Sequence, residues 1–190
     1  MIETALKAVK DLERRGASEA EGYIQNSTEW VISVREGIWN RRKKKDICIG
    51  LRTVIEKKKG FAAGTLPMCP LEDIEKASLL LSRNAVPDPS WSHLPYPKPV
   101  IAPEGIFDRN LAEISEGELM DVVETLVSAP GEKCYADCTL ITRLDKTAIA
   151  NTHGVEGFYE DTGIDITFSC GYGRRKATSE WHSRKLDKNI

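Results

Sequence analysis

Two long stretches with strand-type patterning constrain the fold of this chain more than any other feature. The first runs from Tyr23 to Thr65 and is rich in β-branched and aromatic residues, and the second runs from Cys134 to Cys170. A helical pattern precedes each stretch, without the strict strand–helix alternation of a parallel sheet. The sequence therefore predicts an α+β fold with mostly antiparallel strands.

Three helices are expected around these strands. Apolar residues recur at helical spacing over residues 5–12, Pro70 opens a second helical pattern that ends at Asn84, and a capping box, Ser115 to Glu118, starts a third. The face expected for the second helix is Leu71, Ile74, Ala77, Ser78 and Leu81, and the apolar face expected for the third is Leu119, Val122, Val123, Leu126 and Val127. The strands expected within the two stretches are 23–25, 30–34, 47–55, 60–65, 134–143, 147–152, 155–159 and 165–170, with a turn at Asn26–Ser27.

A proline-dense segment separates the two regions. Six prolines lie between Pro87 and Pro103, interspersed with Trp91, His93 and Tyr96. We expect an extended connection that its aromatic side chains pack onto the surface. The resulting organisation is a single domain of two helix-plus-antiparallel-meander halves joined by a proline-rich connection, with the first half at 1–86, the connection at 87–114 and the second half at 115–190.

The overall composition excludes several classes of protein. The net charge of −2 provides no global field that would attract nucleic acid or an anionic membrane. No stretch approaches the roughly 18 consecutive apolar residues of a membrane span. The five cysteines are odd in number and loosely spaced, so we expect reduced thiols in a cytoplasmic protein.

The residues that most often carry chemistry form no complete site. The three histidines, His93, His153 and His182, are not spaced with one another or with a cysteine pair as a metal site requires. Cys134 and Cys138 would lie on one face of a strand about 13 Å apart, too far for one metal ion. We therefore predict no catalytic residue and no metal ligand in this chain.

The strongest charge run is Arg41-Arg42-Lys43-Lys44-Lys45. Together with Lys57–Lys59 it would make a basic patch able to bind phosphate groups, beside Trp39 as a stacking partner. Charged hairpin ends also protect edge strands from pairing with other chains. Because the net charge is slightly acidic, the sequence favours this protective interpretation over nucleic-acid binding.

Three short segments resemble a known family. They are Ile49-Gly50-Leu51-Arg52-Thr53-Val54, Lys59-Gly60-Phe61-Ala62-Ala63-Gly64-Thr65, and the turn segment Ile149-Ala150-Asn151-Thr152-His153-Gly154-Val155-Glu156-Gly157. In their order and spacing they are similar to segments of the TldD/PmbA family, also called modulator of DNA gyrase. The resemblance extends over about residues 4–182.

The resemblance implies part of an enzyme. The family is regarded as a group of zinc metallopeptidases whose ligands lie in a C-terminal domain, on an H-E-x-x-x-H helix with a distant cysteine. This sequence contains neither that motif nor that domain, so zinc is expected only in the absent C-terminal domain and the chain alone is expected to be inactive. The family's N-terminal domain helps to enclose the peptide-binding cleft of a homo- or heterodimer, and the same substrate-enclosing role is expected here.

The resemblance also suggests which side chains contact a peptide substrate. Arg52, Asn151 and His153 are the candidates, and the alternative is that they are structural residues of a strand and a turn. Two other functions stay open: a nucleic-acid or protein-partner binding module that uses residues 41–45, and a scaffold or dimerisation domain without a ligand.

Overall fold

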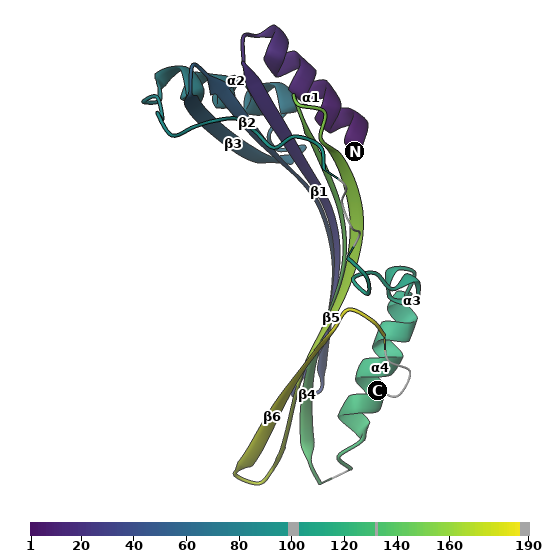
Figure 1. Cartoon of the computed structure of the whole chain (residues 1–190). Helices are drawn as coiled ribbons and strands as arrows, with labels where there is room; N and C mark the ends of the chain where they lie inside the picture. Colours follow the sequence, from purple (N-terminus) through teal and green to yellow (C-terminus); the bar gives the residue numbers. More distant parts are fainter. Residues whose placement is uncertain (99–102, 132, 187–190) are drawn as a thin grey trace. The chain divides into compact units, whose positions relative to one another are not determined.

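The structure is a computed structural model that describes residues 1–98, 103–131 and 133–186. It confirms the α+β prediction, because helices accompany one six-stranded antiparallel sheet with the strand order β3-β2-β1-β4-β5-β6 (Figure 1). The elements are α1 (Ile2–Arg14), β1 (Glu19–Arg35), β2 (Ile38–Ile55), β3 (Lys58–Leu66), α2 (Leu71–Asn84), α3 (Arg109–Ala112), α4 (Glu116–Ser128), β4 (Tyr135–Asn151), β5 (Glu156–Tyr172) and β6 (Arg175–Ser183).

Five strands, β1 to β5, are longer than the sequence predicts. The turn expected at Asn26–Ser27 is wrong, since β1 continues through both residues and Ser27 donates a hydrogen bond to Asp145 instead. β4 and β5 each merge two predicted strands in the same way. Ser27 is tolerated inside β1, because its side chain lies on the face opposite the buried Ile24 and finds a hydrogen-bond partner on β4. β6 was not predicted at all, because its sequence is almost entirely polar.

The chain divides into two compact units that are interleaved in sequence. Strands β1, β2, β4 and β5 each supply residues to both units, so the structure does not divide at the proline-rich connection into the sequence halves 1–86 and 115–190. Unit 1 consists of Met1–Asn26, Asp46–Ala102 and Lys146–Tyr159, and unit 2 of Ser27–Lys45, Pro103–Asp145 and Glu160–Ile190.

The core of unit 1 lies between the sheet and two helices. Helix α1 buries Leu12 and the small residues before it, and β2 contributes Leu51. The face predicted for α2 is correct at Ile74, which is buried, but wrong at Leu81, which is half exposed. Leu79 takes the buried position instead, because this helix packs on β3 through an interface that also buries two serines.

A carboxylate is buried between the two helices of unit 1. Glu75 of α2 is 2% exposed, and its Oε2 lies 3.2 Å from Nη2 of Arg15. Burial raises the pKa of Glu75 above its ordinary value of 4.5, and the attraction of Arg15 offsets this effect only in part. The folded state therefore binds a proton more tightly at this site than the unfolded state does.

This raised pKa gives stability a defined dependence on pH. The contribution of Glu75 is most favourable below pH 4.5 and is lost as the pH rises through the folded-state pKa. Glu75→Gln removes the ionisation, so the stability of the variant relative to the wild type should increase between pH 4.5 and pH 7.5. Urea denaturation at both pH values measures the difference, and a relative stability that is constant or falls with pH would contradict the prediction.

The core of unit 2 lies between α4 and the sheet. Leu119 and Val123 of α4 are fully buried against Ile32, Leu140 and Ile164 of three strands. Cys138 is buried among them, and burial raises the pKa of its thiol to about 11, which keeps the thiol protonated and unreactive. The apolar face predicted for this helix is therefore the face that packs.

Helix α4 begins with the predicted capping box. The Glu118 amide donates to Oγ of Ser115 at 3.2 Å, and the Ser115 amide donates to Oε2 of Glu118 at 2.8 Å. Ser115→Ala should lower the free energy of unfolding by about 1 kcal/mol, because it leaves a helix N-terminal amide without its side-chain acceptor. Chemical denaturation checks this value, with Ser115→Asn as the control that retains a capping oxygen. An unchanged midpoint for the alanine variant would show that the cap contributes nothing.

Candidate functional site

One carboxylate of unit 1 binds the proline-rich connection to the sheet. Glu19 begins β1, and since its neighbour Ala20 is buried in the core, its own side chain lies on the opposite face. Its Oε2 accepts hydrogen bonds from Nε1 of Trp91 and from the amide of Leu94, both at 3.1 Å, and its Oε1 lies 3.2 Å from Nε2 of His153. We call Glu19, Trp91, Leu94 and His153 the Glu19 anchor.

The predicted residue Asn151 holds the turn beside this anchor. Its Oδ1 accepts from the amides of His153 at 2.9 Å and Val155 at 3.0 Å, which fixes the turn between β4 and β5. Its Nδ2 donates to the carbonyl oxygen of Pro95 at 2.8 Å. Asn151 is only 4% exposed, so its side chain is committed to these structural bonds.

Aromatic rings complete the contact between the turn and the connection. The centroid of Tyr96 lies 4.4 Å from that of His153 and 4.8 Å from that of His93. The connection is therefore packed onto the unit through its aromatic residues, as the sequence predicts. The predicted connection also includes residues 99–102, which lie outside the described residues.

Of the three residues predicted to contact a substrate, two are brought together. Asn151 and His153 share the turn described above, whereas Arg52 lies on β2 with its Nη1 3.4 Å from Oε1 of Glu21. Arg52 retains substantial exposure, with 45% of its side chain accessible, while the side chain of His153 is 21% accessible. All three have intramolecular partners, and Arg52 is the most available for a ligand.

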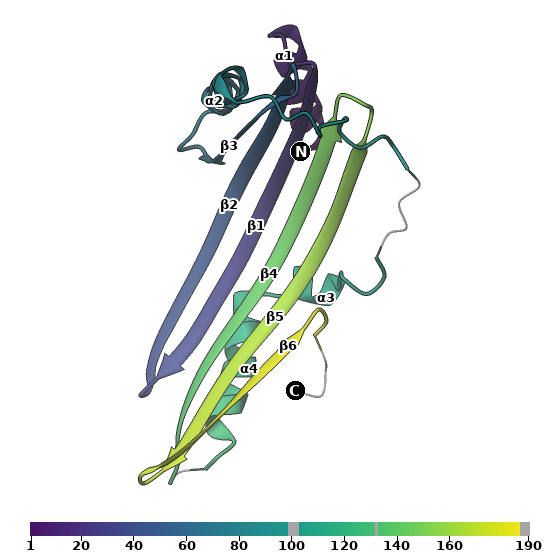
Figure 2. The same ribbon diagram turned by 60° about the vertical axis from the view of Figure 1, so that its left-hand side comes forward.

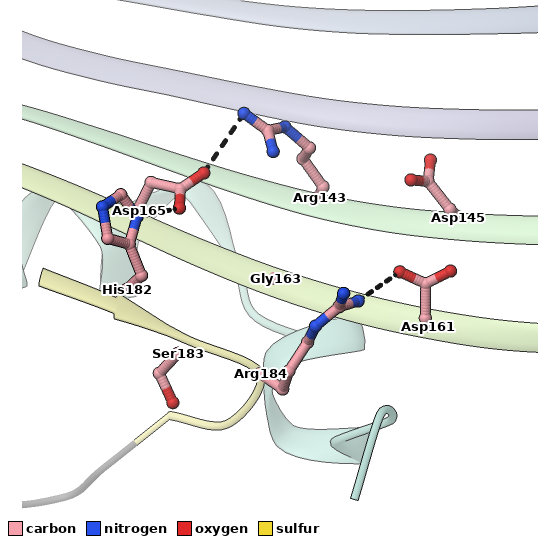
Figure 3. A pocket seen from close by; sticks show the side chains of 8 residues that line it. All are labelled: Arg143, Asp145, Asp161, Gly163, Asp165, His182, Ser183 and Arg184. Atoms are coloured by element: carbon pink, nitrogen blue, oxygen red, sulfur yellow. Dashed lines mark hydrogen bonds and ion pairs between the residues drawn. The ribbon is translucent and has the colours of Figure 1, made fainter. Parts of the chain in front are cut away.

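Unit 2 contains a polar cavity of about 440 Å³ that sequence reasoning missed. In Figure 3 the Arg143 side chain extends toward Asp165, and Arg184 extends toward Asp161. The only available sequence signal was the alternation of polar residues on strands that bury their other face against α4. The lining residues are Arg143, Asp145, Asp161, Gly163, Asp165, His182, Ser183 and Arg184.

A ladder of alternating charges crosses the sheet beside this cavity. Glu29 lies 3.8 Å from Arg42 on one side and 3.4 Å from Arg143 on the other. Asp165 continues the ladder, with oxygens 3.1 Å from Arg143 and 2.6 Å from His182. Because arginines and carboxylates alternate along the ladder, the face is strongly polar. Such cross-strand pairs also stabilise the sheet register.

The basic run and the second lysine run belong to different units. Arg41–Lys45 lies in unit 2 and Lys57–Lys59 in unit 1. The Nη1 of Arg41 lies 3.0 Å from Glu116, and Nζ of Lys43 lies 4.5 Å from the centre of the Trp30 ring. The residues of the basic run nevertheless all remain exposed.

The described residues do not offer a zinc site. Among them, no group of three or more His, Cys, Asp or Glu side chains is arranged to hold a metal ion. Over the same residues, no helix has the length and apolar character to cross a membrane. These side chains therefore do not supply the set of ligands that the family resemblance implies for zinc.

Comparisons with solved structures confirm the resemblance at the level of the fold. No protein-family model matches the chain, and no curated protein sequence does. TldE from Thermococcus kodakarensis superimposes with a TM-score of 0.77 at 16% identity, over 97% of this chain and 43% of that chain. A candidate modulator of DNA gyrase from Bacteroides thetaiotaomicron gives 0.80 at 14% identity, over 98% and 45% of the two chains.

A further candidate modulator of DNA gyrase, from Thermotoga maritima, gives a TM-score of 0.78 at 13% identity, over 96% of this chain and 43% of that one. The chain thus spans less than half the length of the solved structures that it matches. At these identities the comparisons establish a shared fold.

Proposed function

We propose that this chain is a non-catalytic domain that holds and encloses the peptide substrate of a TldD/PmbA-type zinc metallopeptidase, within a homo- or heterodimer. The observation that carries the proposal is the fold shared with TldE and with the two candidate gyrase modulators over at least 96% of this chain. Because the match covers less than half of those proteins, the proposed role is that of one part of a larger catalytic assembly.

The arrangement of the sheet supports a role in binding an extended chain. The ladder side of unit 2 presents polar side chains and a cavity, and a polypeptide offers main-chain donors and acceptors that suit such a surface. In unit 1, the side chain of Arg52 is also accessible, and it lies on β2, the strand that carries Arg42 of the ladder. We propose that the hydrolytic step, in which a zinc ion activates water, belongs to a part of the assembly other than the described residues.

Zinc titration by isothermal calorimetry, with a peptide-cleavage assay on the same sample, tests the non-catalytic role. We expect no stoichiometric high-affinity zinc binding, because the described residues offer no suitable ligand group. We also expect the chain alone to leave a quenched-fluorescent peptide uncleaved. Tight zinc binding at one ion per chain, or zinc-dependent cleavage, would overturn the proposal.

A further inference from the structure

The strand β2 has a stretch of free edge. Its pairing with β3 begins at Ile47 opposite Leu66 and ends at Ile55 opposite Lys58, whereas β2 itself begins at Ile38. Its other neighbour in the sheet is β1. Figure 2 shows β2 continuing beyond the end of β3. Among the residues that the structure describes, 38–46 therefore have a neighbouring strand on one side only, and we call this stretch the free edge of β2.

The turns show which main-chain groups face outward. Glu36 and Gly37 both have positive φ, as do Glu56 and Lys57, so each hairpin has the two-residue turn in which the flanking residues form a hydrogen-bonded pair. Antiparallel pairing alternates from there, so residues 38, 40, 42, 44 and 46 bond to β1. Trp39, Arg41, Lys43 and Lys45 then direct their N–H and C=O groups to the free side.

The side chains along this edge select a particular kind of partner. All residues from Ile38 to Lys45 are exposed, and five consecutive ones are basic. The pair between Arg41 and Glu116 is itself exposed, with 68% and 35% of the two side chains accessible, so replacing it with a partner's carboxylate costs little. A second copy of this chain is a poor partner, since antiparallel self-pairing about Lys43 would place the two basic runs opposite each other.

We infer that the free edge of β2 binds an acidic, extended polypeptide segment as an added strand. Main-chain hydrogen bonds supply the docking, and the basic run supplies selectivity for Asp and Glu. This inference deepens the proposed function and rests on it in one respect, namely that the bound segment belongs to the peptide substrate. The binding itself requires no catalysis and is measured on this chain alone.

The test uses fluorescence anisotropy with a labelled Thr-Glu repeat of about ten residues, enough to cover one strand. The comparison peptides are a Thr-Lys repeat and a Thr-Glu repeat that is N-methylated at alternate amides. We expect the wild-type chain to bind the unmodified acidic peptide at least about tenfold more tightly than either comparison peptide, because one lacks the charge and the other the main-chain donors. Raising the salt concentration should weaken this binding.

A matched pair of variants isolates the edge. Lys43→Pro removes one outward N–H and obstructs an added strand, while the bonds of β2 to β1 remain. Lys43→Ala removes the same charge and the contact with Trp30 but keeps the N–H. Relative to Lys43→Ala, the proline variant should bind the Thr-Glu repeat about tenfold more weakly. Circular dichroism checks that both variants are folded. If they are not, the N-methylated peptide tests on the wild-type chain whether main-chain hydrogen bonds contribute to binding.

Several results would overturn the inference. These are equal binding of the unmodified and N-methylated acidic peptides, equal binding by the two variants, absence of any binding of the acidic peptide, or displacement of the bound peptide by duplex DNA at an equal concentration of charges. If other peptides are retained by the chain while the Thr-Glu repeat is not, the edge assignment fails and the proposed peptide-holding function stands.

Discussion

Gly60→Ala is expected to lower the free energy of unfolding by at least about 3 kcal/mol. A Cβ at this position of β3 would lie 2.2 Å from the carbonyl oxygen of Ser78 and 2.4 Å from the amide nitrogen of Ser82. Both are backbone atoms of α2, so no side-chain rotation relieves the overlap. The helix would have to move away from the sheet and open the core of unit 1.

The matched control is Gly163→Ala in β5, where an added Cβ meets no atom within 4 Å. Its effect should stay within about 0.5 kcal/mol. Urea denaturation followed by circular dichroism measures both variants. If Gly60→Ala is as stable as the wild type, α2 does not approach β3 as closely as the structure shows.

Glu19→Ala is expected to cost about 3 kcal/mol, because it removes the acceptor for three groups at once. The amide of Leu94, a residue with no exposed surface, and the indole N–H of Trp91 would lose their shared partner. His153 would lose the carboxylate that orients its ring. The connection that these groups bind should then detach from the sheet, with faster hydrogen exchange at Leu94 and a change in Trp91 fluorescence.

Glu21→Ala is the control for this prediction. Glu21 lies two residues along the same strand face, and its carboxylate pairs with the exposed side chain of Arg52. Because an exposed ion pair contributes little, the control should change stability by no more than about 1 kcal/mol. Equal effects of the two substitutions would show that Glu19 does not anchor the connection.

The sequence predicted α1, α2, α4 and the fold class well, because these depend on local signals, but it missed the short helix α3, which lies within the predicted connection 87–114. Residues 5–12 and the Ser115–Glu118 capping box carry their patterns within one or two turns, and both appear as expected. The strands were predicted too short at Asn26–Ser27, since nothing local shows that a neighbouring strand supplies Asp145 as a partner for Ser27. The strand β6 was missed for a different reason: its sequence is almost entirely polar, although it pairs with the preceding strand β5 across a short turn.

The candidate sites were predicted less completely than the fold. The turn residues Asn151 and His153 were chosen because loop polar residues often carry function, and the structure does bring them together. Their partner Glu19 lies more than a hundred residues away in the chain, and no motif links the two. The cavity and the charge ladder of unit 2 likewise combine residues of several strands, so only the assembled sheet reveals them.

One measurement tests the central claim that this chain holds peptides without cleaving them. The purified chain, immobilised with zinc present, is incubated with a defined mixture of unstructured synthetic peptides, and the retained peptides are analysed by mass spectrometry. The account predicts that peptides are retained above the level of a bare support and that every retained peptide is intact. It is contradicted if nothing is retained, or if the recovered peptides carry new ends produced by cleavage.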